Sequence, residues 1–331
     1  MKNKINILVV GGAGYIGSHM CKYLFQKGYT PVVLDNLVYG HREAVKWGPF
    51  IEGPMEDELL LSKIFKDYSI QAVMHFAAFA YVGESVTDPG KYYLNNVSAS
   101  ISLLESMRRH NINNFLFSSS CATYGEPLEI PITESHPQNP INPYGRTKLM
   151  VEQILMDYKL AYGINYTSLR YFNAAGADPD AEIGEDHNPV THIIPLVLQT
   201  ALGQRNEISI FGDDYPTEDG TCIRDYIHVT DLAQAHLLAL ESMLNNNTGG
   251  IYNLGNGEGC SVKQVIETAR KVTGKDIRTS VTGRRAGDPA VLIGSSAKAV
   301  NNLGWKPQYG DIKSILETAW RWHEKHPTGY K

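Results

Sequence analysis

The amino-acid sequence predicts an α/β protein that is built on a doubly wound parallel sheet and carries a second, smaller α/β lobe. Three observations lead to this fold class. A short apolar segment near the start of the chain runs directly into a glycine-rich turn and then a helical pattern. Short apolar segments continue to alternate with helical ones up to residue 171. Beyond that residue the loops become longer and more polar.

Composition limits the class of protein before any motif is considered. The chain has 331 residues, of which 43% are hydrophobic and 20% charged, as in globular proteins with a sizeable core. A formal net charge of −5 and the lack of a basic tract argue against nucleic acid as a partner. No apolar run is long enough to span a membrane, and the first residues do not resemble a signal peptide. The four cysteines form no Cys-x-x-Cys pair, so we expect reduced thiols and a cytoplasmic location.

The first strand, residues 5–10, ends in the turn Gly11-Gly12-Ala13-Gly14-Tyr15-Ile16-Gly17. A helical pattern continues from there to Gly28. Strand, glycine turn and helix in this order are the context of a Rossmann dinucleotide-binding fingerprint. The glycines let the backbone approach a pyrophosphate, which then lies at the helix N-terminus.

A second strand, residues 31–34, ends at Asp35. This carboxylate follows the turn by about 20 residues, the spacing at which an acidic residue binds the adenosine ribose of NAD. It would repel the 2′-phosphate of NADP. The sequence therefore predicts NAD as cofactor. The alternative is a glycine turn in an unrelated α/β protein, and the position of Asp35 argues against it.

The alternation continues with strands at 71–76, 114–117 and 166–171 and helices at 93–109 and 144–162. Repeated strand–helix units of this kind give a parallel sheet with helices on both faces. Ligands in such sheets bind beyond the carboxyl ends of the strands, where Ser120, Tyr144 and Asn173 are expected. We predict an NAD-binding domain over residues 1–176 and a substrate-binding lobe over 177–331. A strand at 251–254 is expected to return to the first sheet.

Tyr144 and Lys148 are four residues apart, which places them one turn apart on one helix face. A phenol with a pKa near ~10 is a poor base at neutral pH. A neighbouring ammonium favours the phenolate, so we expect Lys148 to lower the pKa of Tyr144. Alone, this pair is common by chance and is equally well a solvated helix turn. A cofactor site upstream makes it a candidate catalytic pair.

In the second half, Arg224 and Arg285 are candidates for binding a diphosphate, since guanidinium groups form forked hydrogen bonds to phosphate. A surface ion pair is the alternative for each of them. His187 and His192 lie in a polar loop, where we expect no further ligands for a metal ion. We therefore predict no metal site.

Several longer segments resemble the extended short-chain dehydrogenase/reductase family, and within it the UDP-glucose 4-epimerase branch. The similarity extends from the glycine turn to residues 326–330. It includes the segments 82–85, 92–97, 142–145, 169–173, 210–221, 224–229 and 284–289. Several of these segments are specific to the epimerase branch.

The resemblance implies a reversible 4-epimerisation that needs NAD and a UDP-hexose. Tyr144 would remove the proton of the sugar 4-hydroxyl while a hydride passes to NAD. The resulting 4-keto sugar would turn over and take the hydride back on its other face, so NAD stays bound. Lys148 would hold the nicotinamide ribose, and Ser120 would hydrogen-bond the 4-oxygen and relay the proton.

The resemblance also implies the contacts of each ligand. The cofactor contacts are Gly11, Gly14, Tyr15, Ile16, Gly17, Asp35, Asn36, Met55, Phe76, Ala77, Ala78, Asn95, Ser120, Tyr144, Lys148 and Phe172. The substrate contacts are Ser120, Tyr144, Asn173, His192, Phe211, Arg224, Arg285, Asp288 and Leu292. Three positions depart from the pattern of the best-known bacterial epimerases: Pro54 replaces an aspartate, Ala80 a lysine and His192 an asparagine.

Two finer expectations follow from the same resemblance. Leu292 lies where UDP-glucose-specific epimerases tend to carry tyrosine, so the pocket is expected to accept UDP-GlcNAc and UDP-GalNAc as well. Alternatively, Leu292 is only a core residue of a strand. The helices at 93–109 and after Tyr144 resemble the pair that forms a four-helix dimer seam in the family, which implies a homodimer.

Three other functions share parts of this pattern. A nucleotide-sugar 4,6-dehydratase usually needs an Asp-Glu pair after the serine position, but Cys121, Ala122 and Thr123 follow Ser120 here. A reductase would release its cofactor at every turnover. A non-catalytic NAD-binding protein is the least favoured function, because both Tyr144 and Lys148 are present.

Overall fold

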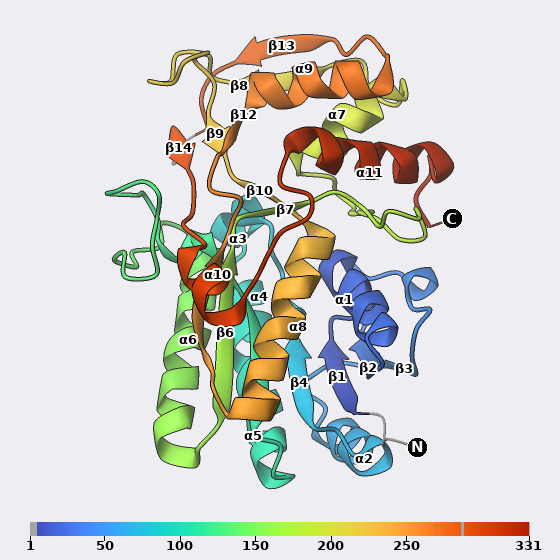
Figure 1. Cartoon of the computed structure of the whole chain (residues 1–331), viewed down its shortest axis with the longest axis vertical. Coiled ribbons are helices and arrows are strands. Elements are labelled where there is room, and N and C mark those ends of the chain that lie inside the picture. Colours follow the sequence, from blue (N-terminus) through green and yellow to red (C-terminus); the bar gives the residue numbers. More distant parts are fainter. Residues whose placement is uncertain (1–4, 286–287, 331) are drawn as a thin grey trace.

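The computed structural model of the chain describes residues 5–285 and 288–330. It has a larger body built on one sheet and a smaller lobe at one end of that sheet (Figure 1). The sheet is entirely parallel and has the strand order β11-β6-β5-β4-β1-β2-β3. Its strands are β1 (Asn6–Val10), β2 (Thr30–Asp35), β3 (Phe50–Glu52), β4 (Ala72–His75), β5 (Asn114–Ser120), β6 (Asn165–Tyr171) and β11 (Gly250–Leu254). The predicted doubly wound fold is confirmed.

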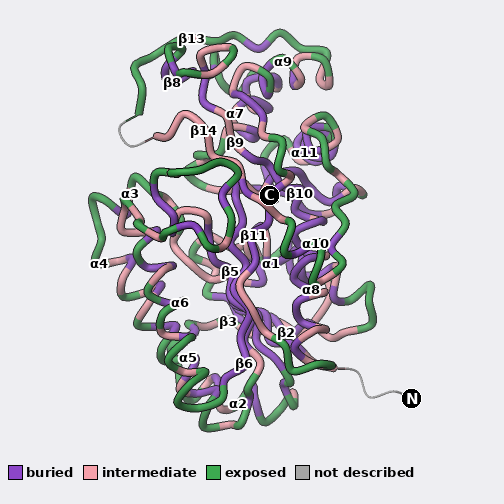
Figure 2. The backbone as a smooth tube through the Cα atoms, turned by 60° about the vertical axis from the view of Figure 1, so that its left-hand side comes forward, coloured by how far each residue is buried: buried purple, intermediate pink, exposed green. Residues whose placement is uncertain are grey.

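Helices cover both faces of this sheet, and each face has its own apolar core. On one face lie α1 (Tyr15–Gln26), α8 (Val229–Asn246) and α10 (Ala297–Leu303). On the other lie α2 (Glu58–Tyr68), α5 (Ala99–Arg109) and α6 (Pro143–Tyr162). Because both faces are covered, the strands are buried over most of their length, and the buried residues concentrate along them (Figure 2).

The segment expected as one helix over 93–109 is divided. It begins as a π-helical segment (Tyr93–Ser98) and continues as α5, and two short helices, α3 (Val82–Thr87) and α4 (Pro89–Tyr92), precede it. Short 3-10 turns occur at Arg42–Ala44 and Cys121–Thr123. Helix α8 begins at Val229, where the Nδ1 atom of His228 accepts a hydrogen bond from the backbone N–H of Thr230 and caps the helix.

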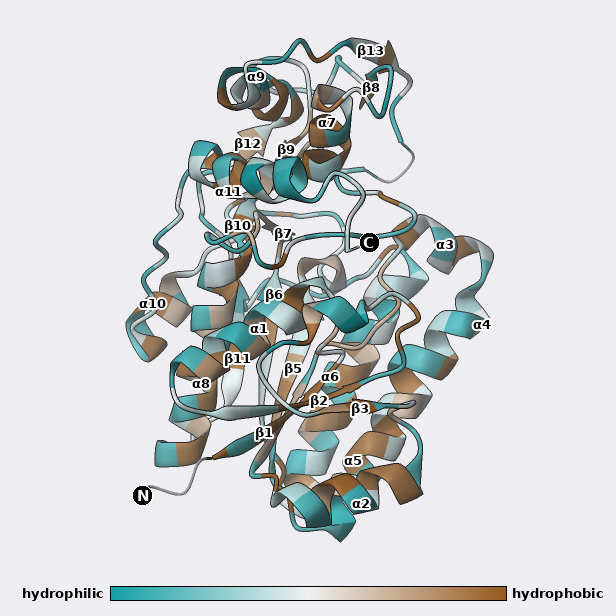
Figure 3. Cartoon of the chain, turned by 90° about the vertical axis from the view of Figure 1, so that its right-hand side faces the viewer, coloured by the Kyte–Doolittle hydropathy of each residue, from teal (hydrophilic) through white to brown (hydrophobic). Residues whose placement is uncertain are grey.

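The smaller lobe is assembled from short strands and three helices. The helices are α7 (Ile193–Ala201), α9 (Val262–Thr273) and α11 (Ile312–Lys325). The strands are β7 (Asn173–Ala175), β8 (Ile208–Phe211), β9 (Ile223–Arg224), β10 (Tyr226–His228), β12 (Cys260–Ser261), β13 (Thr279–Thr282) and β14 (Val291–Leu292). The helices bury one apolar face in a shared core, so hydrophilic and hydrophobic residues alternate along α11 (Figure 3).

The chain passes between the two parts more than once. β11 lies beside β6, and α8 and α10 pack on the large sheet, although all three follow residue 176. The predicted division at residue 176 therefore stays a prediction. Within residues 5–285 and 288–330, every helix is too short or too polar to cross a membrane.

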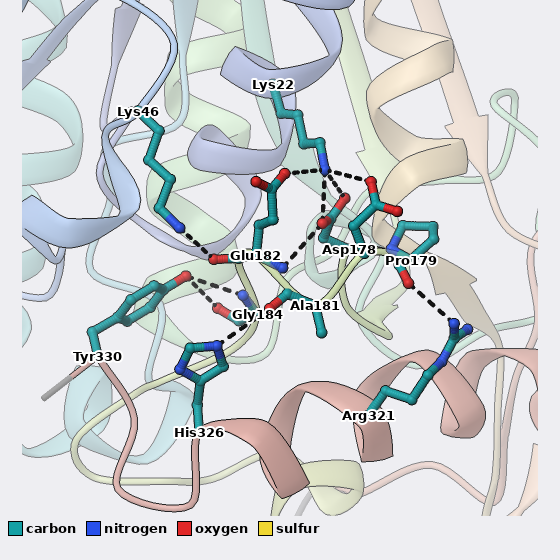
Figure 4. A network of polar contacts seen from close by, with 11 residues as sticks. Lys22, Lys46, Asp178, Pro179, Ala181, Glu182, Gly184, Arg321, His326 and Tyr330 are labelled. Atoms are coloured by element: carbon teal, nitrogen blue, oxygen red, sulfur yellow. Dashed lines mark hydrogen bonds and ion pairs between the residues drawn. The ribbon is translucent and has the colours of Figure 1, made fainter.

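The acidic loop after β7 is tied to α1 by a buried lysine (Figure 4). The Nζ atom of Lys22 lies 2.8 Å from the carboxylate of Asp178, 3.0 Å from that of Asp180 and 2.6 Å from that of Glu182. Arg321 of α11 donates to the carbonyl of Pro179 on the same loop. These contacts fix the path of a loop that the sequence predicts only as irregular.

Helix α6 is held to the sheet by an ion pair that is almost fully buried. The guanidinium of Arg170 in β6 donates two hydrogen bonds to the carboxylate of Glu152, with N–O distances of 2.9 and 2.5 Å. The Oγ atom of Ser119 in β5 donates to the same carboxylate at 2.5 Å. The side chains of Arg170 and Glu152 are 3% and 2% exposed. One carboxylate thus links the helix that carries Tyr144 to two strands.

We predict that Arg170→Met will lower the free energy of unfolding by about 3–5 kcal/mol, because it leaves the Glu152 carboxylate buried without its partner. Urea denaturation followed by circular dichroism measures this change. Lys313→Ala is the control, since its pair with Glu317 is exposed and should contribute almost nothing. Equal stability losses in the two variants would contradict the structural role given to the buried pair.

Candidate active site

A single cavity of about 1160 Å³ lies where the carboxyl ends of the large sheet meet the smaller lobe. Every residue that the sequence assigned to the site lines it: Gly11, Gly14, Tyr15, Ile16, Gly17, Asp35, Asn36, Met55, Phe76, Ala77, Ala78, Asn95, Ser120, Tyr144, Lys148, Phe172, Asn173, His192, Phe211, Arg224, Arg285, Asp288 and Leu292. The volume is enough for a dinucleotide and a second ligand, since drug-sized pockets measure roughly 300–1,000 Å³.

The glycine turn after β1 is packed too closely for side chains. Gly11 has φ +82°, and a Cβ atom there would lie 2.4 Å from the backbone nitrogen of Ala77. A Cβ at Gly17 would lie 2.2 Å from the carbonyl of Gly11. Gly14 precedes the first residue of α1, so bare backbone surrounds the N-terminus of this helix. The turn therefore fits a pyrophosphate.

Asp35 ends β2 with its carboxylate held by the backbone. One oxygen accepts from the N–H of Ala13 at 2.9 Å and the other from the N–H of Leu37 at 2.8 Å. Burial raises the pKa of Asp35, while these hydrogen bonds lower it. Each carboxylate oxygen keeps a further lone pair, so the group can accept hydrogen bonds from ribose hydroxyls. Together with the glycine turn, this arrangement fits NAD.

Tyr144 and Lys148 occupy the first turns of α6, and Ser120 ends β5. The side chain of Asn142 caps the helix by accepting from the N–H of Gly145 at 2.8 Å. Lys148 donates to the carbonyl of Ser118 at 2.7 Å, and its Nζ atom lies 5.9 Å from the centre of the Tyr144 ring. The expected three side chains are therefore brought together at the carboxyl edge of the sheet.

The protonation of this group differs from the expectation. Burial raises the pKa of Tyr144 to about 12, although a hydrogen bond with Ser120 lowers it. Burial lowers the pKa of Lys148 to about 7, although the negative charge of Glu152 raises it. The pKa of Tyr144 in the chain alone is therefore raised, where the sequence predicted a lowered value, because desolvation disfavours the phenolate. Further positive charge in the cavity is needed to favour the phenolate.

The smaller lobe contributes the expected basic and aromatic residues. Arg285 stacks on Phe211, with its guanidinium carbon 3.8 Å from the ring centre. Arg224 forms an ion pair with Asp288, so the two predicted substrate contacts are partners of each other. Leu292 is half-buried and packs against a small cluster that contains Phe172, but it also lines the cavity. Its position is compatible with the predicted gate and with the core alternative.

One expectation about the polar loop was wrong. His187 and His192 do have a neighbour that can bind a metal ion, because the buried carboxylate of Glu185 contacts both rings. Burial opposes ionisation of Glu185, but the two histidines hold its pKa well below the usual range. The charge of Glu185 raises the pKa of His192. A glutamate and two histidines within residues 185–192 were the signal that the sequence analysis missed.

Comparisons with known proteins agree with this site. Residues 7–255 match the NAD dependent epimerase/dehydratase family. The UDP-glucose 4-epimerase of Halalkalibacterium halodurans is 55% identical over 324 residues, covering 98% of this chain and 97% of that protein. The crystal structure of UDP-glucose 4-epimerase from Brucella ovis in complex with NAD has a TM-score of 0.94 at 51% identity, covering 96% of this chain and 98% of that chain.

A further solved structure is named for two kinds of substrate. The UDP-Glc/GlcNAc 4-epimerase of Campylobacter jejuni has a TM-score of 0.84 at 42% identity and covers 97% of this chain and 99% of that chain. Each of these likenesses extends over nearly the whole of both chains. The glycine turn, the carboxylate at the end of β2 and the Tyr144–Lys148 pair lie within the matched family region. The chain therefore belongs to the NAD-dependent epimerase/dehydratase family.

Proposed function

We propose that the chain is a UDP-hexose 4-epimerase that interconverts UDP-glucose and UDP-galactose with bound NAD. The observation that carries the proposal is one cavity in which Tyr144, Lys148 and Ser120 lie between a turn that fits a pyrophosphate and a lobe with two arginines. Two relatives named UDP-glucose 4-epimerase, which are 55% and 52% identical to this chain, support it.

The glycine turn would hold the pyrophosphate of NAD, Asp35 the adenosine ribose and Lys148 the nicotinamide ribose. The other expected contacts line the same cavity: Tyr15, Ile16, Asn36, Met55, Phe76, Ala77, Ala78, Asn95 and Phe172. Bound there, NAD would reversibly accept a hydride from C4 of the sugar, and its oxidised ring would carry a positive charge.

The chain's own residues move and hold the proton. Tyr144 accepts the proton of the sugar 4-hydroxyl, and Ser120, at hydrogen-bonding distance of the phenol, steadies the 4-oxygen. Lys148 is fixed by its hydrogen bond to the Ser118 carbonyl, so its charge stays beside the phenol ring. The 4-keto sugar would return to a 4-hydroxyl when C4 takes the hydride back on its other face and Tyr144 gives the proton back to the 4-oxygen, so no net oxidation results.

The UDP-sugar is assigned to the smaller lobe. Arg224 and Arg285 offer guanidinium groups to the diphosphate, and Phe211 offers an aromatic face to the uracil ring. The side-chain amide of Asn173, the first residue of β7, donates to the carbonyl of Asp225 at 2.9 Å, which orients it. His192 stands at the N-terminus of α7 with a half-exposed ring.

The alternatives fit less well. A 4,6-dehydratase needs an acid after the serine position, but burial raises the pKa of the Cys121 thiol to about 12, and Ala122 and Thr123 carry no carboxyl group. A reductase requires exchange of the cofactor at each turnover, which retention of NAD through purification would exclude. The curated relatives are named as epimerases.

Two further parts of the proposal concern the range of substrates and the oligomeric state. Leucine at position 292 leaves room for an acetamido group at C2 of the sugar, so UDP-GlcNAc and UDP-GalNAc are also substrates. A homodimer is supported by exposed apolar side chains on the segment 93–109 and on α6, which include Leu94, Ile101 and Met150. Four free thiols are in keeping with the cytoplasm.

We predict that Tyr144→Phe will lose roughly 10²–10⁴-fold in kcat, the usual effect of removing a general base, while it keeps the fold and the bound NAD. NMR of the UDP-galactose formed from UDP-glucose measures turnover, and absorbance after denaturation measures NAD. Tyr162→Phe, a half-exposed tyrosine on the same helix, should retain full activity. Near-normal turnover in Tyr144→Phe would refute its role as the base.

We expect Leu292→Tyr to lower kcat/KM for UDP-GlcNAc and to spare UDP-glucose, because the ring fills the space of the acetamido group. Leu292→Met is the matched control and should retain both activities, since it nearly conserves volume. Both substrates are followed by NMR. An equal loss of both activities in the tyrosine variant, or no turnover of UDP-GlcNAc by the wild type, would support the core alternative.

Light scattering at micromolar concentration should give the mass of a dimer. Leu94→Glu should shift the mass to that of a monomer, because Leu94 is 69% exposed beside the predicted seam. Leu59→Glu should remain dimeric, since Leu59 is equally apolar and 85% exposed but lies on α2. A monomeric wild type, or dissociation by both substitutions alike, would show that this surface is not the seam.

A further inference from the structure

Two imidazoles and a carboxylate converge at the cavity wall, at the end of the acidic loop. The Nδ1 atom of His192 lies 2.5 Å from the Oε1 atom of Glu185, and the Nδ1 atom of His187 lies 2.9 Å from the same oxygen. The three ligand atoms all lie within 4.8 Å of one another. All three residues line the cavity, and neither Glu185 nor His187 has a part in the proposed epimerisation.

The backbone on both sides of Glu185 is held in place. A Cβ atom at Gly184 would lie 2.2 Å from the Trp322 ring, and the N–H of Gly184 donates to the hydroxyl of Tyr330 at 3.0 Å. The carboxylate of Asp186 accepts from the N–H of Tyr330 at 3.0 Å. The preceding residues of the loop are bound to α1 and α11 (Figure 4). Glu185 therefore points into the cluster from a fixed support.

This set of atoms is the one that divalent transition metals prefer. Imidazole nitrogen and carboxylate oxygen bind Zn²⁺ at about 2.0–2.1 Å, which places tetrahedral donor atoms roughly 3.3 Å apart. The two distances from the Glu185 carboxylate to the imidazole nitrogens are shorter, because protons now bridge these atoms. Exchange of those protons for a dication requires a movement of the side chains. The His192 side chain is 54% exposed, so its ring is free to move in this way.

A second cluster of acidic groups in the described part of the chain does not have this character. Asp178, Asp180 and Glu182 also lie close together, but they contain no imidazole. The ammonium of Lys22 already occupies their centre at 2.6–3.0 Å. A lysine therefore supplies the positive charge there, and the comparison provides an internal control.

We propose that Glu185, His187 and His192 bind one divalent transition-metal ion, with Zn²⁺ preferred, through the carboxylate and the two Nδ1 atoms. Three protein ligands leave a fourth coordination position, which can be reached from the cavity because all three side chains line it. The ion joins the rigid end of the acidic loop to the start of α7, and the Nε2 atoms of both rings stay outside the coordination shell. This site is independent of the base Tyr144.

The test uses the full chain with its retained NAD and without an affinity tag. After removal of metal with a chelator, Zn²⁺ is titrated in competition with a chromogenic chelator, and bound metal is counted by mass spectrometry after gel filtration. We expect one Zn²⁺ per chain and a rise in melting temperature on binding. Co²⁺ should give the visible bands of a four-coordinate site without a thiolate charge-transfer band.

Glu185→Gln and His187→Ala should each weaken Zn²⁺ binding more than about tenfold, at least as much as the loss of a residue that only supports a metal ligand. Asp180→Asn is the matched control from the lysine-occupied cluster, and it should leave the affinity unchanged. Circular dichroism without metal verifies folding. If Glu185→Gln does not fold, His187→Ala and His192→Ala provide the test, because neither ring lies in the apolar core.

Several outcomes would overturn the proposal. These are binding that does not saturate near one ion per chain, full affinity in both histidine variants, or a loss of affinity in Asp180→Asn equal to that in His187→Ala. A thiolate band with Co²⁺ would assign the metal to a cysteine instead. Loss of metal binding in His187→Ala with unchanged epimerisation would support the metal site and leave the proposed enzyme function intact.

Discussion

The buried pairing of Arg170 with Glu152 is the interaction on which the arrangement of the active site depends. It joins α6 to β6, and the hydrogen bond from Ser119 joins the same carboxylate to β5. Tyr144 and Lys148 stand on that helix and Ser120 at the end of that strand, so one carboxylate fixes the distance between base and serine. Its negative charge also opposes the loss of the Lys148 proton. A pair of this kind is costly to bury, and its value lies in orientation.

The parallel sheet supplies the second constraint, because all its carboxyl ends meet at one edge. The glycine turn follows β1, Asp35 ends β2 and Ser120 ends β5, so residues far apart in the sequence surround one cavity. The smaller lobe closes this edge with β8, β9 and α7. The chain crosses between the two parts several times, and the ion cluster of Lys22 and the Tyr330 contacts hold the connecting loop against both of them.

Charge inside the cavity is unbalanced in a way that suits a charged cofactor and substrate. Burial disfavours both the phenolate of Tyr144 and the ammonium of Lys148 in the chain alone. Positive charge from the oxidised cofactor shifts the phenol toward the base form. Across the cavity, Arg224 is partly neutralised by Asp288, whereas Arg285 stacks on the ring of Phe211. An anionic diphosphate would be drawn to this second arginine.

The sequence by itself determined the fold class and predicted the cofactor turn and the pairing of Tyr144 with Lys148, because each depends on residues close together in the chain. A turn between a strand and a helix, an acidic residue at the next strand end and a tyrosine one helical turn from a lysine have fixed spacings. Only the tertiary structure decided that Glu152 pairs with Arg170, that Asp288 pairs with Arg224 and that Glu185 lies between two histidines. The same holds for the raised pKa of Tyr144. These features depend on how segments pack and on how much water they exclude, and neither leaves a periodic pattern in the sequence.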